Sequence, residues 1–324
     1  MPYRPIPSHF KPCCMLQIED QLEHPTHRSN SLSPINQLLV ALRFYATGSF
    51  QLVVGDTFNI DTATACRTLH RVTRAIAGLR DRLVRFPDTE QLLRDTMKEF
   101  HSKSKLPGIV GAIDCSHIPI QSPGGDDAEI YRNRKGYFSV NVQLISTPNN
   151  YITDVVARWP GSVHDSTIFE NSLIRGKFET GQCRGYLVGD GGYASRAYML
   201  TPLVNPATAA EHSYNAAHVA ARNCIERTNG ILKRRFACLK YCLRLKLENI
   251  LPVIVATVVL HNIAVMTRDD EPGDDDELDE YINRRRQQGL QVDYDPVEVM
   301  PLTGNIAAGA TGVRRALIDN VFTV

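Results

Sequence analysis

The sequence lacks the cysteine patterns and the apolar segments that mark secreted and membrane proteins. Its eight cysteines include no CxxC pair and follow no regular spacing, which argues against a disulfide framework or a structural zinc site. The N-terminus, MPYRPIPSHF, has no basic start followed by an apolar core, so it does not read as a signal peptide. Residues 250–266 are the most apolar stretch but contain Pro252, His261 and Asn262, and we expect them to fall short of a membrane span. These absences favour a reducing compartment and no membrane attachment.

The sequence also lacks a large net charge and internal repeats. Its formal net charge of +1 is unevenly spread, because a basic segment (residues 233–246) precedes an acidic one (269–280). This split is compatible with a nucleic-acid surface followed by a solvated acidic tail. With 324 residues, 43% of them hydrophobic and 22% charged, the chain can build one large domain or two smaller ones.

Helical periodicity dominates residues 33–105. A first helix is expected to stop at Gly48, and a second, short one to cover residues 50–58. A third is expected over residues 62–80, with Asp61 as its N-cap. Three helices joined by two tight turns have the size and layout of a helix-turn-helix module. The alternative is an ordinary helical bundle that packs on the main domain.

The middle of the chain changes to strand periodicity. Residues 108–113 form a short apolar run that ends at Asp114. Residues 138–144 alternate apolar and polar side chains, and residues 151–159 follow a turn, so the three strands predict an antiparallel meander. A fourth strand is expected over residues 185–189, after an intervening helix.

Two carboxylates, Asp114 and Asp190, stand at the ends of predicted strands, where an α/β sheet presents its chemistry. Two acids at such a place would repel each other unless hard cations such as Mg²⁺ or Mn²⁺ balance them. A pair of these ions can activate a nucleophile and stabilise the leaving oxygen at a phosphodiester. Glu226, on a helix expected over residues 216–239, fits as the third acid. Each acid alone is usually a cap, a turn residue or a solvated charge, but the three together predict a metal-dependent nuclease.

Asp165 lies where the third predicted strand gives way to a helix. Two interpretations are open for its side chain, which is either the helix N-cap or a fourth metal ligand. The neighbouring His164 is either a structural histidine or a group that assists proton transfer.

Basic residues at two places are candidates for binding the DNA backbone. Arg132, Arg134 and Lys135 lie in the turn before the second strand, and Lys233 and Arg234 share a helix with the third acid. Arginine and lysine supply the sequence-independent part of DNA binding. For the turn, a solvated basic loop is the alternative.

Five segments resemble the PIF/Harbinger transposases, namely GAIDCSHI, NRKGYFSVNVQ, WPGSVHDSTIFENS, YLVGDGGYASRAYMLTPL and ARNCIERTNGILKRRFACL. They look most like the domesticated Harbinger transposase-derived nucleases of the DDE endonuclease superfamily, over about residues 33–268. The resemblance implies an RNase H-like fold with strand order 3-2-1-4-5, an N-terminal helix-turn-helix-like region and divalent-metal phosphodiester chemistry. It places the family's acids at Asp114, Asp190 and Glu226, with a further acid at Asp165. It also implies a Myb-like DNA-binding partner that supplies specificity and nuclear entry.

We therefore predict an α/β protein whose RNase H-like mixed sheet has three antiparallel strands, then parallel strands, with flanking helices. The predicted organisation is an extended lead-in (1–32), a helix-turn-helix-like region (33–105), a nuclease domain (106–268) and an acidic, partly flexible tail (269–324). The predicted function is DNA cleavage by a two-metal-ion mechanism, in the nucleus and also the cytoplasm. The alternative is a DNA-binding or scaffold protein that kept the fold and lost cleavage. A small-molecule hydrolase is disfavoured, because the sequence has no G-x-S-x-G motif.

Overall fold

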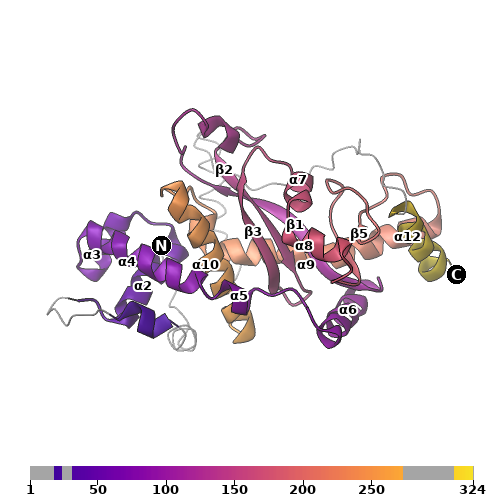
Figure 1. The fold of residues 1–324 in the computed structure, drawn as a ribbon, viewed down its shortest axis with the longest axis horizontal. Coiled ribbons are helices and arrows are strands. Elements are labelled where there is room, and N and C mark those ends of the chain that lie inside the picture. The colour runs from indigo at the N-terminus through magenta and orange to yellow at the C-terminus, as the bar shows by residue number, and fades with distance from the viewer. Residues whose placement is uncertain (1–17, 24–30, 273–309, 324) are drawn as a thin grey trace. The chain divides into compact units, whose positions relative to one another are not determined.

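The computed structural model describes residues 18–23, 31–272 and 310–323, and divides the chain into two compact units (Figure 1). Each unit is assembled from segments that are distant in the sequence. Unit 1 comprises Met1–Val84, Ile118–Val140 and Gly230–Asp293, and unit 2 comprises Arg85–His117, Asn141–Asn229 and Tyr294–Val324. The sequence predicted four consecutive segments. The two units group the residues by their contacts and do not test those segment boundaries, so the four segments stay a prediction.

Unit 1 is built mainly from helices. They are α2 (Pro34–Thr47), α3 (Gln51–Phe58), α4 (Thr62–Ala77), α5 (Arg80–Leu83) and α10 (Leu247–Met266), with the short turns η1 (Ala128–Tyr131) and η2 (Ala237–Leu239). The first three confirm the three helices expected in this region, although α4 ends at Ala77. Local signals set the ends of these helices. At the start of α4, the Asp61 carboxylate accepts a hydrogen bond from the Thr64 backbone amide at 2.9 Å, and at the end of α2, Gly48 adopts a φ of 62°.

The turn between α3 and α4 is tight and depends on a glycine. Asn59 ends α3 in the left-handed region with φ of 50°, and the Ile60 amide donates back to the Gly55 carbonyl at 3.0 Å. A Cβ atom at Gly55 would lie 2.7 Å from the Ile60 carbonyl oxygen, so no larger residue fits without a shift. The helix-turn-helix identity of this region stays a prediction.

Helix α10 is 20 residues long and apolar enough, by length and composition, to cross a membrane. The expectation that this segment falls short of a membrane-spanning helix is therefore wrong as regards its length and composition. However, 72% of its apolar window is buried inside the protein, and it packs against α4. Both observations are those of a core helix.

Unit 2 contains most of a five-stranded mixed sheet in the order β3-β2-β1-β4-β5. The strands are β1 (Ile109–Pro119), β2 (Ser139–Ser146), β3 (Ile152–Pro160), β4 (Tyr186–Val188) and β5 (Met199–Leu200). A short turn joins β2 to β3, closed by a hydrogen bond from the Thr147 amide to the Tyr151 carbonyl, whereas β4 pairs in parallel with both β1 and β5. This is the strand order that the family resemblance implies.

Strand β1 continues past the point where the sequence predicted its end. The expected end at Asp114 is wrong, because the chain stays extended to Pro119. Residues 109–113 are fully buried, while residues 114–117 are only half-buried. The apolar pattern thus marks where the buried part of the strand stops, and not where the strand stops.

The helices of unit 2 are α6 (Glu90–Ser104), α7 (Asp165–Glu170), α8 (Leu173–Glu179), α9 (Ala209–Arg235) and α12 (Ala310–Leu317), followed by the turn η3 (Ile318–Phe322). Helix α6 was not expected from the sequence. Helix α9 begins before the expected residue 216, and its last residues, from Gly230, belong to unit 1. Residues 1–17 and 24–30 of the predicted lead-in, and 273–309 of the predicted tail, lie outside the described residues.

The apolar core of unit 2 joins the sheet to α7, α8 and the chain after β4. Its buried members come from all of these elements: Phe86, Val110, Ile113, Ile145, Phe169, Ile174, Phe178, Cys183, Leu187, Tyr193 and Met199. This core fixes the strands and loops that carry the acidic residues.

Candidate active site

Two of the predicted acids lie level with each other along neighbouring parallel strands, Asp114 within β1 and Asp190 just after the end of β4. Ala112 of β1 pairs with Val188 of β4, and Asp114 and Asp190 each follow that pair by two residues. Because side chains alternate along a strand, both carboxylates continue the same face of the sheet at the same edge. The structure therefore brings these two residues together.

The pKa of Asp114 is raised from its ordinary value to about 7. Burial is the main cause, since the side chain is 16% exposed, and the charges of Asp190 and Asp165 raise it further. The Arg222 guanidinium acts in the opposite direction. The charges of Asp165 and Asp190 thus act on Asp114, so these three carboxylates share one electrostatic environment.

Asp165 is the first residue of α7, and the N-cap position belongs to His164. The N-cap interpretation of Asp165 is therefore wrong. Its Oδ1 atom instead accepts a hydrogen bond of 2.9 Å from the Asn141 amide on β2. This contact holds the Asp165 carboxylate against the sheet.

Glu226 joins this group through an arginine that sequence reasoning missed. Arg222 lies one turn earlier on α9 and donates to Glu226 Oε1 at 2.6 Å and, at 3.4 Å, to Asp114 Oδ1. Its side chain is only 14% exposed. Asn229 donates to the other Asp114 oxygen at 3.0 Å. The signal was present in the sequence, because a basic residue four positions before an acid on a helix meets that acid.

The side chains fit a hard divalent cation by their chemistry, since Asp114, Asp165, Asp190 and Glu226 offer carboxylate oxygens. Two amide oxygens nearby, Asn229 Oδ1 and Asn141 Oδ1, are buried without a hydrogen-bond partner among the described residues. In the same part of the chain, no three Asp, Glu, His or Cys side chains stand close enough to hold a metal ion. Arg222 itself pairs with two of the four acids, Asp114 and Glu226.

The predicted DNA-binding residues belong to unit 1. Arg132 makes an ion pair of 2.7 Å with Glu129 and lies 4.4 Å from the Phe138 ring centre, so it stabilises its own turn. Arg134 and Lys135 are exposed, while Lys233 and Arg234 are half-buried near the end of α9. Their role in DNA binding stays a prediction.

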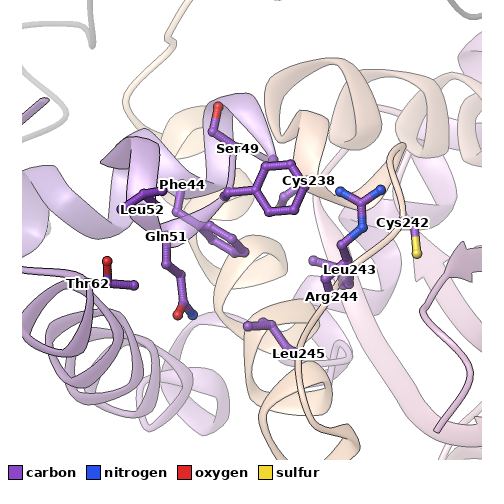
Figure 2. Close-up of a pocket in the computed structure, with 12 residues that line it drawn as sticks. Phe44, Ser49, Gln51, Leu52, Thr62, Cys238, Cys242, Leu243, Arg244 and Leu245 are labelled. Atoms are coloured by element: carbon purple, nitrogen blue, oxygen red, sulfur yellow. The ribbon is translucent and has the colours of Figure 1, made fainter. Parts of the chain in front are cut away.

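Unit 1 also has a pocket of about 270 Å³ (Figure 2). Phe44 and Leu243 contribute to its apolar wall, and the Arg244 guanidinium lies 4.6 Å from the centre of the Phe50 ring. Phe50 is 60% exposed although it is apolar. The pocket has no carboxylate in its lining and is chemically unlike the acidic site.

Comparison with known proteins identifies the family to which the chain is related. The family described as DDE superfamily endonuclease matches residues 113–262, a range that contains all four acids. The chain is 38% identical over 248 residues to "Putative nuclease HARBI1" of Mus musculus, covering 75% of this chain and 71% of that protein. Its Homo sapiens counterpart is 37% identical over the same shares. "Protein ALP1-like" of Arabidopsis thaliana is 27% identical over 81% of this chain and 70% of that protein. No solved structure matches the chain significantly.

Proposed function

Since the chain belongs to the Harbinger transposase-derived nucleases of the DDE endonuclease superfamily, we propose that it is a metal-dependent DNA endonuclease. The observation that carries the proposal is the shared environment of Asp114, Asp165 and Asp190, in which burial first, and the charges of Asp190 and Asp165 in addition, raise the pKa of Asp114 to about 7. Such a group of carboxylates is costly to hold together without a cation and is typical of metal sites.

In this proposal Asp114, Asp190 and Glu226 would hold two Mg²⁺ or Mn²⁺ ions. Asp165, held by Asn141, is a further ligand. Two bound ions would supply Lewis acidity to both the attacking and the leaving oxygen of the scissile phosphate. Glu226 has to leave Arg222 to reach the metal, and Asp114 has to be deprotonated. Lys233 and Arg234 contribute phosphate contacts.

Helix α4 is the best candidate for positioning DNA. Arg67, Arg71 and Arg74 are exposed and follow one another at helical spacing along one face, and the helix contains no acidic residue. The opposite face packs on α2 and α10. Such an arginine stripe fits the phosphates of a duplex. We also propose that the protein has a Myb-like protein as its partner and is located in the nucleus as well as the cytoplasm.

Metal binding can be tested by titrating Mn²⁺ into the wild type and into Asp190→Asn by calorimetry. We expect binding in the wild type and its loss, by at least about tenfold in affinity, in the variant, because one carboxylate ligand is removed. Asp95→Asn is the matched control, since Asp95 is an exposed acid on α6. Nicking of a supercoiled plasmid by the wild type in Mn²⁺, absent in Asp190→Asn, would then identify the enzyme. Equal or absent binding in both proteins would remove the two-metal mechanism.

One observation favours the second candidate, a DNA-binding or scaffold protein without cleavage. Arg222 neutralises part of the acidic group internally, so the carboxylates are not left bare in the metal-free protein. Asp114→Ala separates the two candidates. A scaffold variant would keep DNA binding and its cellular role, whereas a nuclease variant would lose that role while it still binds DNA.

A further inference from the structure

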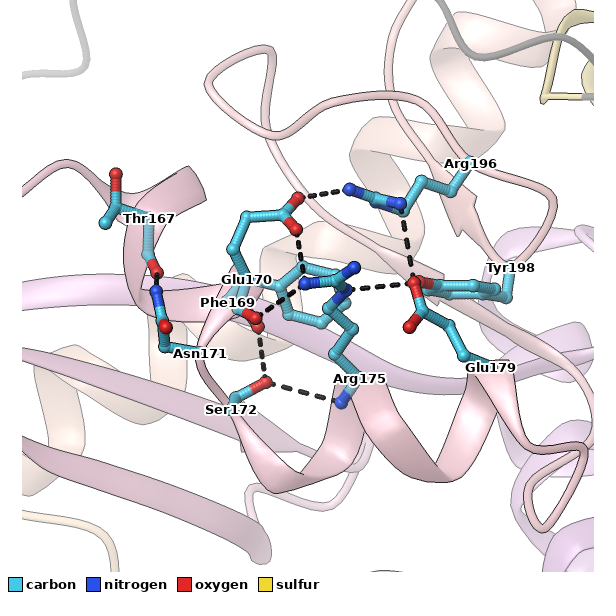
Figure 3. Close-up of polar contacts among 9 residues, drawn as sticks. All are labelled: Thr167, Phe169, Glu170, Asn171, Ser172, Arg175, Glu179, Arg196 and Tyr198. Atoms are coloured by element: carbon cyan, nitrogen blue, oxygen red, sulfur yellow. Dashed lines mark hydrogen bonds and ion pairs between the residues drawn. The ribbon is translucent and has the colours of Figure 1, made fainter.

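A network of ion pairs begins at Glu170, the last residue of α7, whose first residue is Asp165 (Figure 3). Glu170, the last residue of α7, pairs with Arg196 and, at 2.7 Å, with Arg175 of α8. Glu179 of α8 accepts from Arg175 at 2.9 Å and from Tyr198 at 3.1 Å, and lies 3.6 Å from Arg196. Two arginines thus hold two glutamates in one closed arrangement.

This network joins the two loops that carry acids. The segment with Glu170 begins at Asp165, and the segment with Arg196 begins at Asp190. Arg196 pairs with both Glu170 and Glu179, so its charge ties the chain after β4 to both helices. The separation of the two acids therefore depends on a contact that includes neither of them.

The surroundings make these ion pairs stronger than ordinary surface pairs. The Arg196 side chain is 23% exposed and that of Glu170 is 32% exposed, so solvent screens their attraction only partly. A second, apolar layer links the same segments: the rings of Phe169 and Tyr193 meet edge to face, and those of Phe178 and Tyr198 stack at 5.1 Å. Because this layer remains when charges are removed, variants of the network are expected to fold.

We propose that Arg196 is a positioning residue that sets the distance between Asp165 and Asp190 and thereby the affinity of the acidic site for metal. The inference rests on the proposed metal binding. In this proposal Arg196 itself binds neither the metal nor DNA. It acts through Glu170 and Glu179, as residues behind metal ligands commonly do.

The test is Mn²⁺ calorimetry on Arg196→Met, Arg196→Lys, Glu170→Gln and the double variant Arg196→Met/Glu170→Gln. We expect Arg196→Met to weaken Mn²⁺ binding about tenfold, Arg196→Lys to recover most of that loss, and the double variant to bind no more weakly than the worse single one. Arg94→Met is the control, because Arg94 forms an exposed pair with Glu90 on α6. Thermal unfolding of each variant reports stability separately.

Two results would overturn the inference. One is wild-type Mn²⁺ affinity in folded Arg196→Met. The other is additive losses in the double variant that follow the unfolding temperature, which would mean a merely structural role. If the wild type itself bound no Mn²⁺, the proposed metal-dependent function would fail together with this inference. If the wild type bound Mn²⁺ and Arg196→Met bound it equally well, only the inference about Arg196 would fail.

Discussion

At the scale of single residues, the acidic site is governed by one cation that the protein supplies itself. Arg222 binds two of the three predicted catalytic acids, and Asn229 fixes the other oxygen of Asp114. The acids were predictable from the sequence because their order and spacing match a family pattern. The spacing of Arg222 to Glu226 could be read from the sequence, but its contact with Asp114 could not, because a charged residue in the middle of a helix usually faces solvent and only the packed structure shows Arg222 buried.

This arrangement predicts the effect of removing the Arg222 charge. Arg222→Gln should bind Mn²⁺ about tenfold more tightly than the wild type, since a divalent ion no longer meets a guanidinium beside Asp114. Loss of that charge also favours protonation of Asp114. However, a proton carries half the charge of Mn²⁺, so removing the guanidinium strengthens metal binding more than it strengthens proton binding.

Calorimetry of Arg222→Gln and Arg222→Lys checks the idea, because the lysine keeps the charge and should bind like the wild type. Weaker binding in Arg222→Gln with normal binding in Arg222→Lys would contradict competition and assign Arg222 a role in placing the acids.

At the scale of elements, local signals decided which helices could be predicted. Asp61 and Gly48 begin and end helices through hydrogen bonds to nearby backbone, so α2 and α4 could be located from sequence. Helix α6 has the polar sequence EQLLRDTMKEFHSKS and buries only three of its residues, so its apolar pattern is weak. Strand β1 was cut short for the same reason, since its half-buried residues after Ile113 break the apolar run.

Helix α4 predicts how DNA affinity depends on salt. In the absence of divalent metal, Arg67→Gln/Arg71→Gln/Arg74→Gln should reduce the slope of log affinity against log salt by up to ~2.7, about 0.9 for each phosphate that the variant no longer neutralises. Fluorescence anisotropy with a duplex at several salt concentrations measures this slope. A control with Arg94→Gln and Lys98→Gln changes exposed basic residues on α6 instead. If the slope fell equally in both variants, α4 would have no special role.

At the scale of the whole molecule, strand order and unit composition differ in how far a sequence can reveal them. The order of the five strands follows from the family resemblance and agrees with the structure. The two units could not be foreseen, because each gathers segments that are far apart in the chain and no composition change marks their borders. The same holds for the network of Arg175 and Arg196, whose partners meet only after folding.

Folding stability should depend on pH through His218, a buried residue of α9. Burial lowers its pKa to about 4, while its Nε2 atom lies 3.1 Å from the Leu200 carbonyl and donates to it. The unfolded chain binds the His218 proton more tightly than the folded protein does. The contribution of His218 to the free energy of unfolding is therefore fully present above about pH 6.5 and falls by about 3 kcal/mol as the pH drops towards 4.

Chemical unfolding between pH 7 and pH 4 measures this loss. His218→Gln should show a flatter profile, whereas His212→Gln, which removes an exposed histidine from the same helix, should keep the wild-type profile. Identical profiles in all three proteins would exclude His218 as the source.

The parallel register of β1 and β4 constrains how this site can change during evolution. One residue inserted into β4 after Leu187 would turn the Asp190 side chain to the opposite face of the sheet, whereas two would restore the face and displace the carboxylate by about 7 Å. The exposed residues 180–182, between α8 and β4, obey no such parity and can lengthen at the surface. Descendants of this protein should therefore vary in the spacing from Asp165 to β4, and hardly at all in the spacing of Asp114 and Asp190 from the paired residues Ala112 and Val188.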